Sequence, residues 1–196
     1  MYHTERLQKQ MAFLLEVDKM KNIIRQTYLS DGSRKENDAE HSWHLALMAI
    51  ILSEYFDKDI DLLKVVKMLL IHDIVEIDAG DTFCHDQKAN EDKKEREEKA
   101  AKRIYQILPD DQAQEYKSLW HEFENVSTKE SVFANILDRL QPSILNLSSN
   151  GKSWLEHEVS KKQVLKRNEM VFSGPEEIAE YMKMLLDTAV KSGYLK

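Results

Sequence analysis

Residues 61–81 constrain the fold more than any other part of the chain. The first part of this stretch is apolar on nearly every side, which is typical of a buried helix. Near its end it nevertheless carries His72, Asp73 and Glu76. A buried carboxylate is costly unless it is paired, hydrogen-bonded or bound to a metal. Two carboxylates and a histidine so close together therefore indicate a site. The glycine before Asp81 breaks the helix, and Asp81 is expected on the loop that follows.

Apolar residues at helical spacing predict further helices, and no strand pattern of useful length is found. The predicted helices cover residues 4–21 with the pattern continuing to Arg25, 37–56, 61–80, 91–103, 110–123, 128–142, 157–170 and 176–190. Residues 30–33 form a turn signal, and the mixed charges of residues 91–103 indicate a solvated helix face. Pro142 is expected to end the helix that contains it.

Polar residues at the predicted helix starts are suitable N-caps. Either Asn37 or Asp38 can cap the second helix, and either Asp59 or Asp61 can cap the central one. Thr128 can cap the helix over residues 128–142.

These patterns predict an all-α protein, and the low content of five Gly and three Pro agrees with it. We expect one domain over residues 1–196. Its motif-bearing core covers about residues 14–142, and C-terminal helices within residues 155–192 pack on that core.

The charge and the cysteine count limit the class of protein. A net charge of −7 argues against a long nucleic acid as partner but leaves a single nucleotide open. Cys84 is the only cysteine, so the chain has no internal disulfide, and a reducing cytoplasm is the expected location. We interpret Cys84 as a small packing residue. No apolar run approaches the roughly 20 residues of a membrane span, so no membrane partner is expected.

Four residues on three predicted helices are candidate metal ligands, namely His41, His72, Asp73 and Asp138. Their meeting is a tertiary hypothesis that spacing cannot establish. A mixed histidine and carboxylate shell suits a divalent ion such as Mn, Co, Zn, Fe, Ni or Mg and does not choose among them.

The order of these four residues resembles the HD-domain metal-dependent phosphohydrolases, whose signature is a His, a His-Asp pair and a distant Asp. The resemblance is closer to the branch with the nucleoside 5′-monophosphatases, the 5′-deoxynucleotidases. That branch has an upstream Arg, a Glu-Asn-x-x-Glu-His string and a His-Asp-x-x-Glu-x-x-x-Gly-Asp string. Here they are Arg25, residues 36–41 and residues 72–81, and the resemblance covers roughly residues 14–142.

The resemblance implies an all-helical, divalent-metal-dependent phosphohydrolase that removes the phosphate from a nucleoside or deoxynucleoside 5′-monophosphate or a similar small phosphate ester. His41, His72, Asp73 and Asp138 would hold the metal. Glu76 would orient the attacking water or carry its proton, with Asp73 beside it at the catalytic centre.

The substrate contacts implied by the resemblance are Arg25 on the phosphate and Asp81 on a sugar hydroxyl. Arg34 is a nearby competitor for the phosphate, and His44 could support His41 or simply pack. One departure concerns the sugar. Deoxynucleotidases of this kind place an aromatic residue after the arginine, where it helps to exclude the ribose 2′-hydroxyl, and this chain has Gln26 there.

Two alternatives remain open at this stage. One is hydrolysis of pyrophosphate or phosphodiester bonds in another nucleotide on the same scaffold. The other is a regulatory protein that binds metal or nucleotide without turnover, which the presence of Glu76 and Asp81 disfavours. A homodimer is expected because two-fold dimers are the commonest oligomers, and an exposed apolar face on the first or last helix could form the contact.

Overall fold

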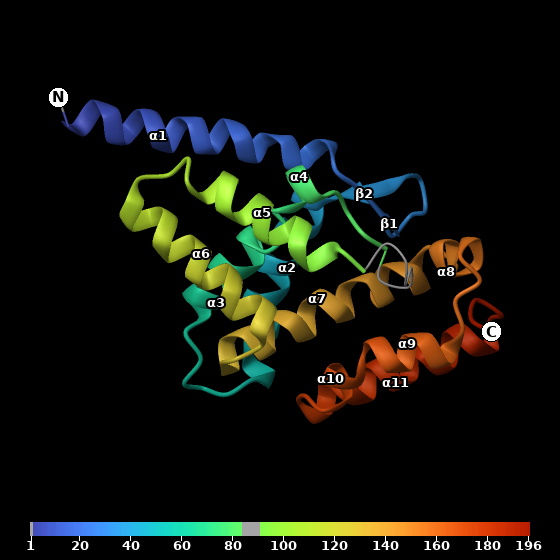
Figure 1. Cartoon of the computed structure of the whole chain (residues 1–196). Helices are drawn as coiled ribbons and strands as arrows, with labels where there is room; N and C mark the ends of the chain where they lie inside the picture. The colour runs from blue at the N-terminus through green and yellow to red at the C-terminus, as the bar shows by residue number, and fades with distance from the viewer. Residues whose placement is uncertain (1, 84–90) are drawn as a thin grey trace.

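The structure is a computed structural model that describes residues 2–83 and 91–196. It is built of helices with one small antiparallel hairpin (Figure 1), which confirms the all-α prediction. The elements are, in chain order, α1 (Tyr2–Val17), the 3₁₀ helix η1 (Asp18–Asn22), β1 (Ile24–Tyr28), β2 (Lys35–Asn37), α2 (Asp38–Leu52), the 3₁₀ helix η2 (Ser53–Tyr55), α3 (Leu62–Ile71), α4 (Glu76–Ala79), α5 (Lys93–Tyr105), α6 (Asp110–Asn125), α7 (Lys129–Ser148), α8 (Lys152–Glu156), α9 (Lys161–Arg167), α10 (Glu169–Phe172) and α11 (Glu176–Lys191).

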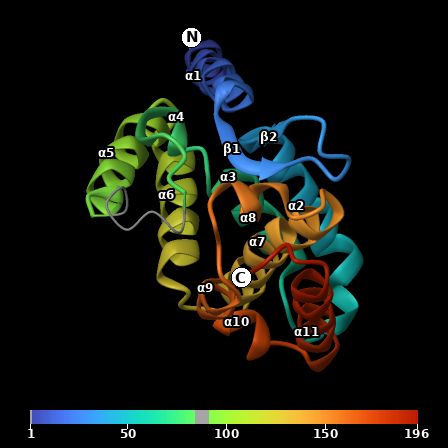
Figure 2. The ribbon, with the colours of Figure 1, turned by 90° about the vertical axis from the view of Figure 1, so that its right-hand side faces the viewer.

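Helix α7 lies at the centre of the packing. It contacts α2, α3 and α6 on one side and α10 and α11 on the other. In Figures 1 and 2, α9, α10 and α11 lie at the opposite end of the molecule from α1. One hydrophobic cluster runs through these contacts, which is the arrangement that a single domain requires. Its fully buried large side chains include Leu45, Met68, Leu69, Tyr105, Phe133, Leu137, Leu140, Met182 and Leu185.

Three helices begin at residues that the sequence analysis named as possible caps. The Asn37 side chain accepts from the Glu40 backbone N–H in a capping box that opens α2. Asp61 accepts from the Lys64 N–H at the start of α3, and Thr128 opens α7. Asn37 and Asp61 are therefore the caps, not Asp38 and Asp59.

The hairpin β1–β2 contradicts the prediction of a helical pattern up to Arg25 and of a chain without strands. β1 and β2 pair antiparallel, and the predicted turn over residues 30–33 connects them. Gly32 in that turn has φ +68°, a conformation that glycine adopts without the steric cost of a side chain. β2 has three residues, which is too short to show an alternating pattern, so the strand was invisible to periodicity.

The central helix is shorter and less buried than predicted. α3 ends at Ile71, a turn over residues 72–75 follows, and α4 is a single short helix. Leu63 and Leu70 are 66% and 45% exposed, so the prediction of a helix buried on every side is wrong. Gly80 has φ +74° and ends α4, as predicted, and residue 81 follows outside the helix.

Pro142 does not end its helix, contrary to the prediction. α7 continues to Ser148 with Pro142 inside it. The predicted helix over residues 157–170 is instead divided between α9 and α10. Ser160 starts α9 with a capping box of its own, so the division follows a local signal in the sequence.

Two further predictions concern the cysteine and a membrane span. Cys84 lies outside the described residues. Among the residues that are described, none of the helices combines the length and the apolar character that crossing a membrane needs.

Candidate metal centre and substrate pocket

Four side chains from separate parts of the chain meet beside α7. His41 from α2, His72 from the end of α3, and Asp73 present ligand atoms that lie within 4.8 Å of one another. Asp138 from α7 completes the group, with its Oδ1 3.1 Å from His41 Nε2 and 3.6 Å from His72 Nε2. Asp73 Oδ2 lies 3.1 Å from His72 Nε2 and 3.8 Å from His41 Nε2. The structure therefore brings together the four residues named as candidate ligands.

Both imidazole rings are held from their far side. His72 Nδ1 lies 2.9 Å from the Leu69 carbonyl oxygen, to which an Nδ1–H donates. His41 Nδ1 lies 3.1 Å from Gln141 Oε1. When each Nδ1 carries the proton, each Nε2 presents its lone pair to the two carboxylates. This is the tautomer and orientation that a metal-ligating histidine needs.

The Gln141 amide is fixed in turn by a buried carboxylate. Its Nε2 donates to Glu36 Oε2 at 3.0 Å and lies 3.3 Å from His44 Nδ1. Burial raises the pKa of Glu36 to about 7, with Arg25 opposing the rise. His44 and His41 are therefore both contacted by the Gln141 amide.

The two histidines differ in their protonation. Burial, assisted by the charge of Arg25, lowers the pKa of His41 to about 4, so His41 is neutral near pH 7. Burial acts in the same direction on His72, but Asp73 and Asp138 outweigh it and raise the His72 pKa well above its usual value. A proton on His72 and a cation between the carboxylates would be alternative occupants, because a metal binds the neutral imidazole.

The donor set fits a divalent cation. Three buried atoms of the centre have no hydrogen-bond partner among residues 2–83 and 91–196, namely His72 Nε2, Asp38 Oδ2 and Glu76 Oε2. An unpaired buried polar atom destabilises a fold by about 1–3 kcal/mol. Asp38, Asp73 and Glu76 also present oxygens within 4.8 Å of one another. A bound cation would satisfy these atoms and reduce the repulsion between the carboxylates.

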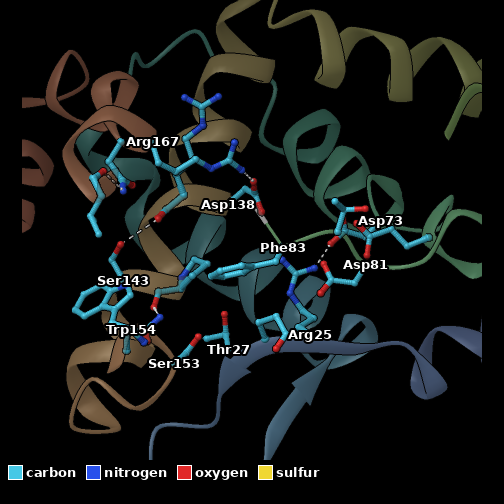
Figure 3. A pocket seen from close by; sticks show the side chains of 18 of the residues that line it. Arg25, Thr27, Asp73, Asp81, Phe83, Asp138, Ser143, Ser153, Trp154 and Arg167 are labelled. Carbon is cyan, nitrogen blue, oxygen red and sulfur yellow. Dashed lines mark hydrogen bonds and ion pairs between the residues drawn. The ribbon is translucent and has the colours of Figure 1, made fainter. Parts of the chain in front are cut away.

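Arg25 on β1 lies against these carboxylates. Its Nη1 donates to Asp73 Oδ2 at 2.7 Å (Figure 3). The same Nη1 also donates to Asp38 Oδ1 at 3.1 Å. Its Nε lies 3.7 Å from Glu36 Oε1. The Arg25 guanidinium, which was predicted to bind a phosphate, thus contacts carboxylates in this structure. Arg34, the competitor considered from the sequence, pairs instead with Glu40 at the surface.

Glu76 and Asp81 flank Asp73 on the same side of the centre. Glu76 is 4% exposed, and burial, reinforced by Asp73 and Asp38, raises its pKa well above the usual range. Burial also raises the pKa of Asp81, while Arg25 opposes the rise. Both carboxyl groups line a pocket that opens over the metal centre. They therefore line the same pocket as the candidate metal ligands Asp73 and Asp138.

The pocket extends from the centre towards the C-terminal helices, as Figure 3 shows. β1 lies along one side with Gln26 and Thr27, and the Phe83 ring lies between Arg25 and Asp138. The lining on the far side comes from α7, α8 and α9: Arg139, Pro142, Ser143, Asn146, Ser153, Trp154, Val164, Arg167 and Asn168.

Several of these residues were missed from the sequence. Glu36 and Asp38 belong to the string that carries the family resemblance, so their positions were visible although their roles were not. Gln141 is one helical turn beyond Asp138, which is a usable signal for a residue that supports the site. Arg167 carries no motif, and only the tertiary packing of α9 places it at the pocket. Trp154 was considered as a possible border of a pocket, and it lines this one.

Comparison with known sequences agrees with this geometry. A family model described as HD domain matches residues 17–179. The chain is 31% identical to human 5′-deoxynucleotidase HDDC2 over 155 residues, which are 78% of this chain and 72% of the human protein. It is 32% identical to the bovine protein of the same name over 133 residues, 67% of this chain. That match spans 63% of the bovine protein, less than two thirds of its length.

Solved structures show the same architecture. A protein from Magnetospirillum magnetotacticum MS-1, described as a predicted metal-dependent phosphohydrolase, is 50% identical with a TM-score of 0.95. The match covers 100% of this chain and 98% of that one. A protein from Pyrococcus horikoshii OT3 is 22% identical with a TM-score of 0.64, over 93% of this chain and 99% of its own, and shares the fold.

Proposed function

The chain belongs to the HD-domain family, and we propose that it is a divalent-metal-dependent phosphohydrolase that removes the phosphate from nucleoside or deoxynucleoside 5′-monophosphates. The observation that carries the proposal is the meeting of His41, His72, Asp73 and Asp138 at the base of a pocket that also contains Arg25. The relatives named 5′-deoxynucleotidase support a nucleotide as the substrate.

The two imidazoles and two carboxylates would hold the metal. His41 is neutral near pH 7 and Gln141 fixes its ring, so its Nε2 is available as a ligand without loss of a proton. A divalent ion bound there supplies positive charge to a phosphate oxygen and lowers the pKa of a coordinated water. The histidine and carboxylate donors suit Mn, Co, Zn, Fe or Ni, with Mg as the hard alternative.

Glu76 is the candidate proton acceptor. Its carboxyl group is buried close to Asp73 and Asp38, and its Oε2 has no hydrogen-bond partner within the described part of the chain. Burial, reinforced by repulsion from Asp73 and Asp38, raises the Glu76 pKa. A bound cation would oppose this rise and leave a carboxylate able to take a proton from water.

Arg25 and Asp81 would position the substrate. Arg25 Nη1 is shared between Asp73 and Asp38, and a metal at Asp73 would compete for that carboxylate. The guanidinium could then donate to the phosphate while Asp38 and Glu36 keep it in place. Asp81 lines the same pocket, where its carboxylate could accept from a sugar hydroxyl.

We also propose that the chain forms a homodimer. The outer side of α2 carries Trp43, Leu47, Ile50 and Ile51 at helical spacing, and all four are exposed. A row of large apolar side chains on one helix is typical of a contact with another protein surface, and a second copy is the simplest partner.

The activity is tested by orthophosphate release from ribo- and deoxyribonucleoside 5′-monophosphates, after chelation and re-addition of Mn, Co, Mg or Zn. We expect orthophosphate only when metal is restored. The same assay with diesters and triphosphates, read by product, separates this activity from diester cleavage and from pyrophosphate release. A protein with metal bound and no orthophosphate from any monophosphate would contradict the proposal.

A further inference from the structure

Two arginines face the pocket from the side opposite to Arg25. Arg139 follows Asp138 on α7, and Arg167 is the last residue of α9, so two helices that are distant in sequence supply them. Arg167 Nη2 lies 3.9 Å from Asp138 Oδ2, which places its guanidinium beside the metal centre (Figure 3). The pocket of an acidic chain thus presents cations at both of its ends.

The two ends differ in how their cations are balanced. Arg25 contacts three carboxylates, namely those of Glu36, Asp38 and Asp73. Arg139 Nε is buried and has no hydrogen-bond partner among the described residues. Arg139 is next to Asp138 in the chain, and Arg167 Nη2 lies 3.9 Å from Asp138 Oδ2. The acidic group at this end of the pocket is therefore the Asp138 carboxylate.

That carboxylate is one of the four candidate metal ligands. Asp138 Oδ1 lies 3.1 Å from His41 Nε2. A divalent cation held at the centre would neutralise part of the charge of the Asp138 carboxylate. Arg139 and Arg167 would then be left with less compensating charge than they have without metal. Guanidinium groups at a pocket wall are suited to an anion, above all to phosphate.

We propose that Arg139 and Arg167 form a second phosphate subsite, and that the preferred substrate is a nucleotide with a second phosphate besides the one removed. This inference rests on the proposed phosphohydrolase function. Water attacks the phosphorus at the metal centre, and the bond from phosphorus to the leaving oxygen breaks. That oxygen takes a proton, orthophosphate leaves, and the second phosphate stays on the product.

The position of the subsite limits the kind of substrate. Arg167 lies beside Asp138, so the second phosphate must lie close to the first. It can be the inner phosphate of a nucleoside 5′-diphosphate or the 3′-phosphate of a nucleoside 3′,5′-bisphosphate. The two compounds share the chemistry that the arginines recognise, and separate arms of the experiment distinguish them.

The experiment compares kcat/KM for adenosine 5′-monophosphate, adenosine 5′-diphosphate and adenosine 3′,5′-bisphosphate. We expect one of the two-phosphate compounds to exceed the monophosphate in the unmodified protein. In Arg139→Gln and in Arg167→Gln that ratio should fall about tenfold, because a charge-assisted hydrogen bond to phosphate is lost. Lys166→Gln is the matched control, since Lys166 is an exposed cation on the same turn of α9, and its ratio should not change.

A binding measurement keeps the test independent of turnover. Glu76→Gln protein with metal restored is titrated with the same three compounds by calorimetry, alone and combined with Arg167→Gln. We expect the two-phosphate compound to bind more tightly only while Arg167 is present. If no monophosphate is hydrolysed but this difference is found, the proposed reaction fails and the subsite stands.

Two results would overturn the subsite. One is an equal loss for all three compounds in the arginine variants, which would assign Arg139 and Arg167 to the phosphate that is removed. The other is a ratio that is the same in the unmodified protein, in both arginine variants and in Lys166→Gln.

Discussion

At the scale of single residues, the Asp73 carboxylate connects the metal centre to the substrate side of the pocket. Its Oδ2 lies 3.1 Å from His72 Nε2 and accepts from Arg25 Nη1 at 2.7 Å. The cationic surroundings lower the Asp73 pKa although burial opposes this, with His72 and Arg25 as the main charges. Asp73 is therefore ionised near pH 7, and its carboxylate can bind a cation or accept a hydrogen bond from Arg25.

Asp73 and Glu76 should separate metal binding from turnover. We expect Asp73→Ala to lose bound metal and activity together, because it removes one of the four candidate ligands. Glu76→Gln should retain metal and lose at least about 100-fold in kcat, a typical contribution of general acid–base catalysis. Metal content by elemental analysis and orthophosphate release check both. Full retention of metal by Asp73→Ala would disprove the ligand assignment.

Gln26 is the residue at which this chain departs from the deoxynucleotidase pattern. Its Oε1 accepts from Lys35 Nζ at 2.6 Å and lies 3.3 Å from His157 Nε2, so polar neighbours hold it at the pocket wall. A polar amide leaves room for, and can hydrogen-bond to, a ribose 2′-hydroxyl. The ring that excludes this hydroxyl in the family pattern is absent at this position.

Gln26→Trp should therefore raise the preference for deoxyribonucleotides over ribonucleotides. We expect the ratio of kcat/KM values to rise about tenfold, since steric discrimination at a pocket wall is typically worth about 1–3 kcal/mol. Gln26→Ala is the control, because it removes the same polar contacts without adding a ring. A ratio that rises equally in both variants would show that the lost amide, not the added ring, sets the sugar preference.

At the scale of elements, local signals in the sequence located the starts of three core helices. Asn37, Asp61 and Thr128 cap helices as their side chains predict, because an N-cap is a contact within one turn of the chain. The β1–β2 hairpin was missed because its stability depends on pairing and on packing against α7 and α8, not on apolar alternation. Arg25 was consequently placed on a helix, although its identity as a site candidate came from the motif.

Pro142 shows the same limit within a single helix. A proline usually ends a helix because it lacks the N–H that would donate to the carbonyl of the residue four positions earlier, here Asp138. α7 nevertheless continues, and Asn146 Nδ2 donates to the Pro142 carbonyl at 2.9 Å. Packing of α7 against helices on both of its sides outweighs the local cost.

Replacing this proline should stabilise the protein. In Pro142→Ala the restored N–H and the lost ring clash favour the helix by about 3 kcal/mol, and the lost packing of the ring opposes this by about 1–2 kcal/mol. We expect a gain of about 1–2 kcal/mol in the free energy of unfolding, measured by denaturant titration. A less stable variant would show that the proline packs better than its backbone costs.

At the scale of the whole molecule, the pocket is a product of long-range packing. The ligands come from α2, from the segment after α3 and from α7, and their order along the chain identified them before their distances were known. The far wall comes from α8 and α9, which lie beyond the segment that carries the family resemblance. No periodicity connects Arg167 or Trp154 to His41, so only the structure could assign them to the same pocket.

The exposed side of α2 leads to the last prediction, on assembly. Trp43 and Ile51 are 64% and 60% exposed, whereas Leu45 and Ala49 on the opposite side of the same helix are fully buried. If two copies pair through this side, a charge placed at its centre would be desolvated without a partner. Ile50→Glu should therefore convert the dimer to a monomer, as measured by sedimentation velocity over a range of concentrations.

The control for that prediction is Met184→Glu, which places the same charge at a comparably exposed apolar residue on α11. It should leave the sedimentation coefficient unchanged. Helix α2 carries Trp43 and Leu47 and, near its start, Asp38 and His41. Loss of the dimer contact should therefore also loosen the candidate metal centre. We expect Ile50→Glu to bind metal less tightly than Met184→Glu does. Equal sedimentation of Ile50→Glu and the unmodified protein would exclude this side of α2 as the dimer contact.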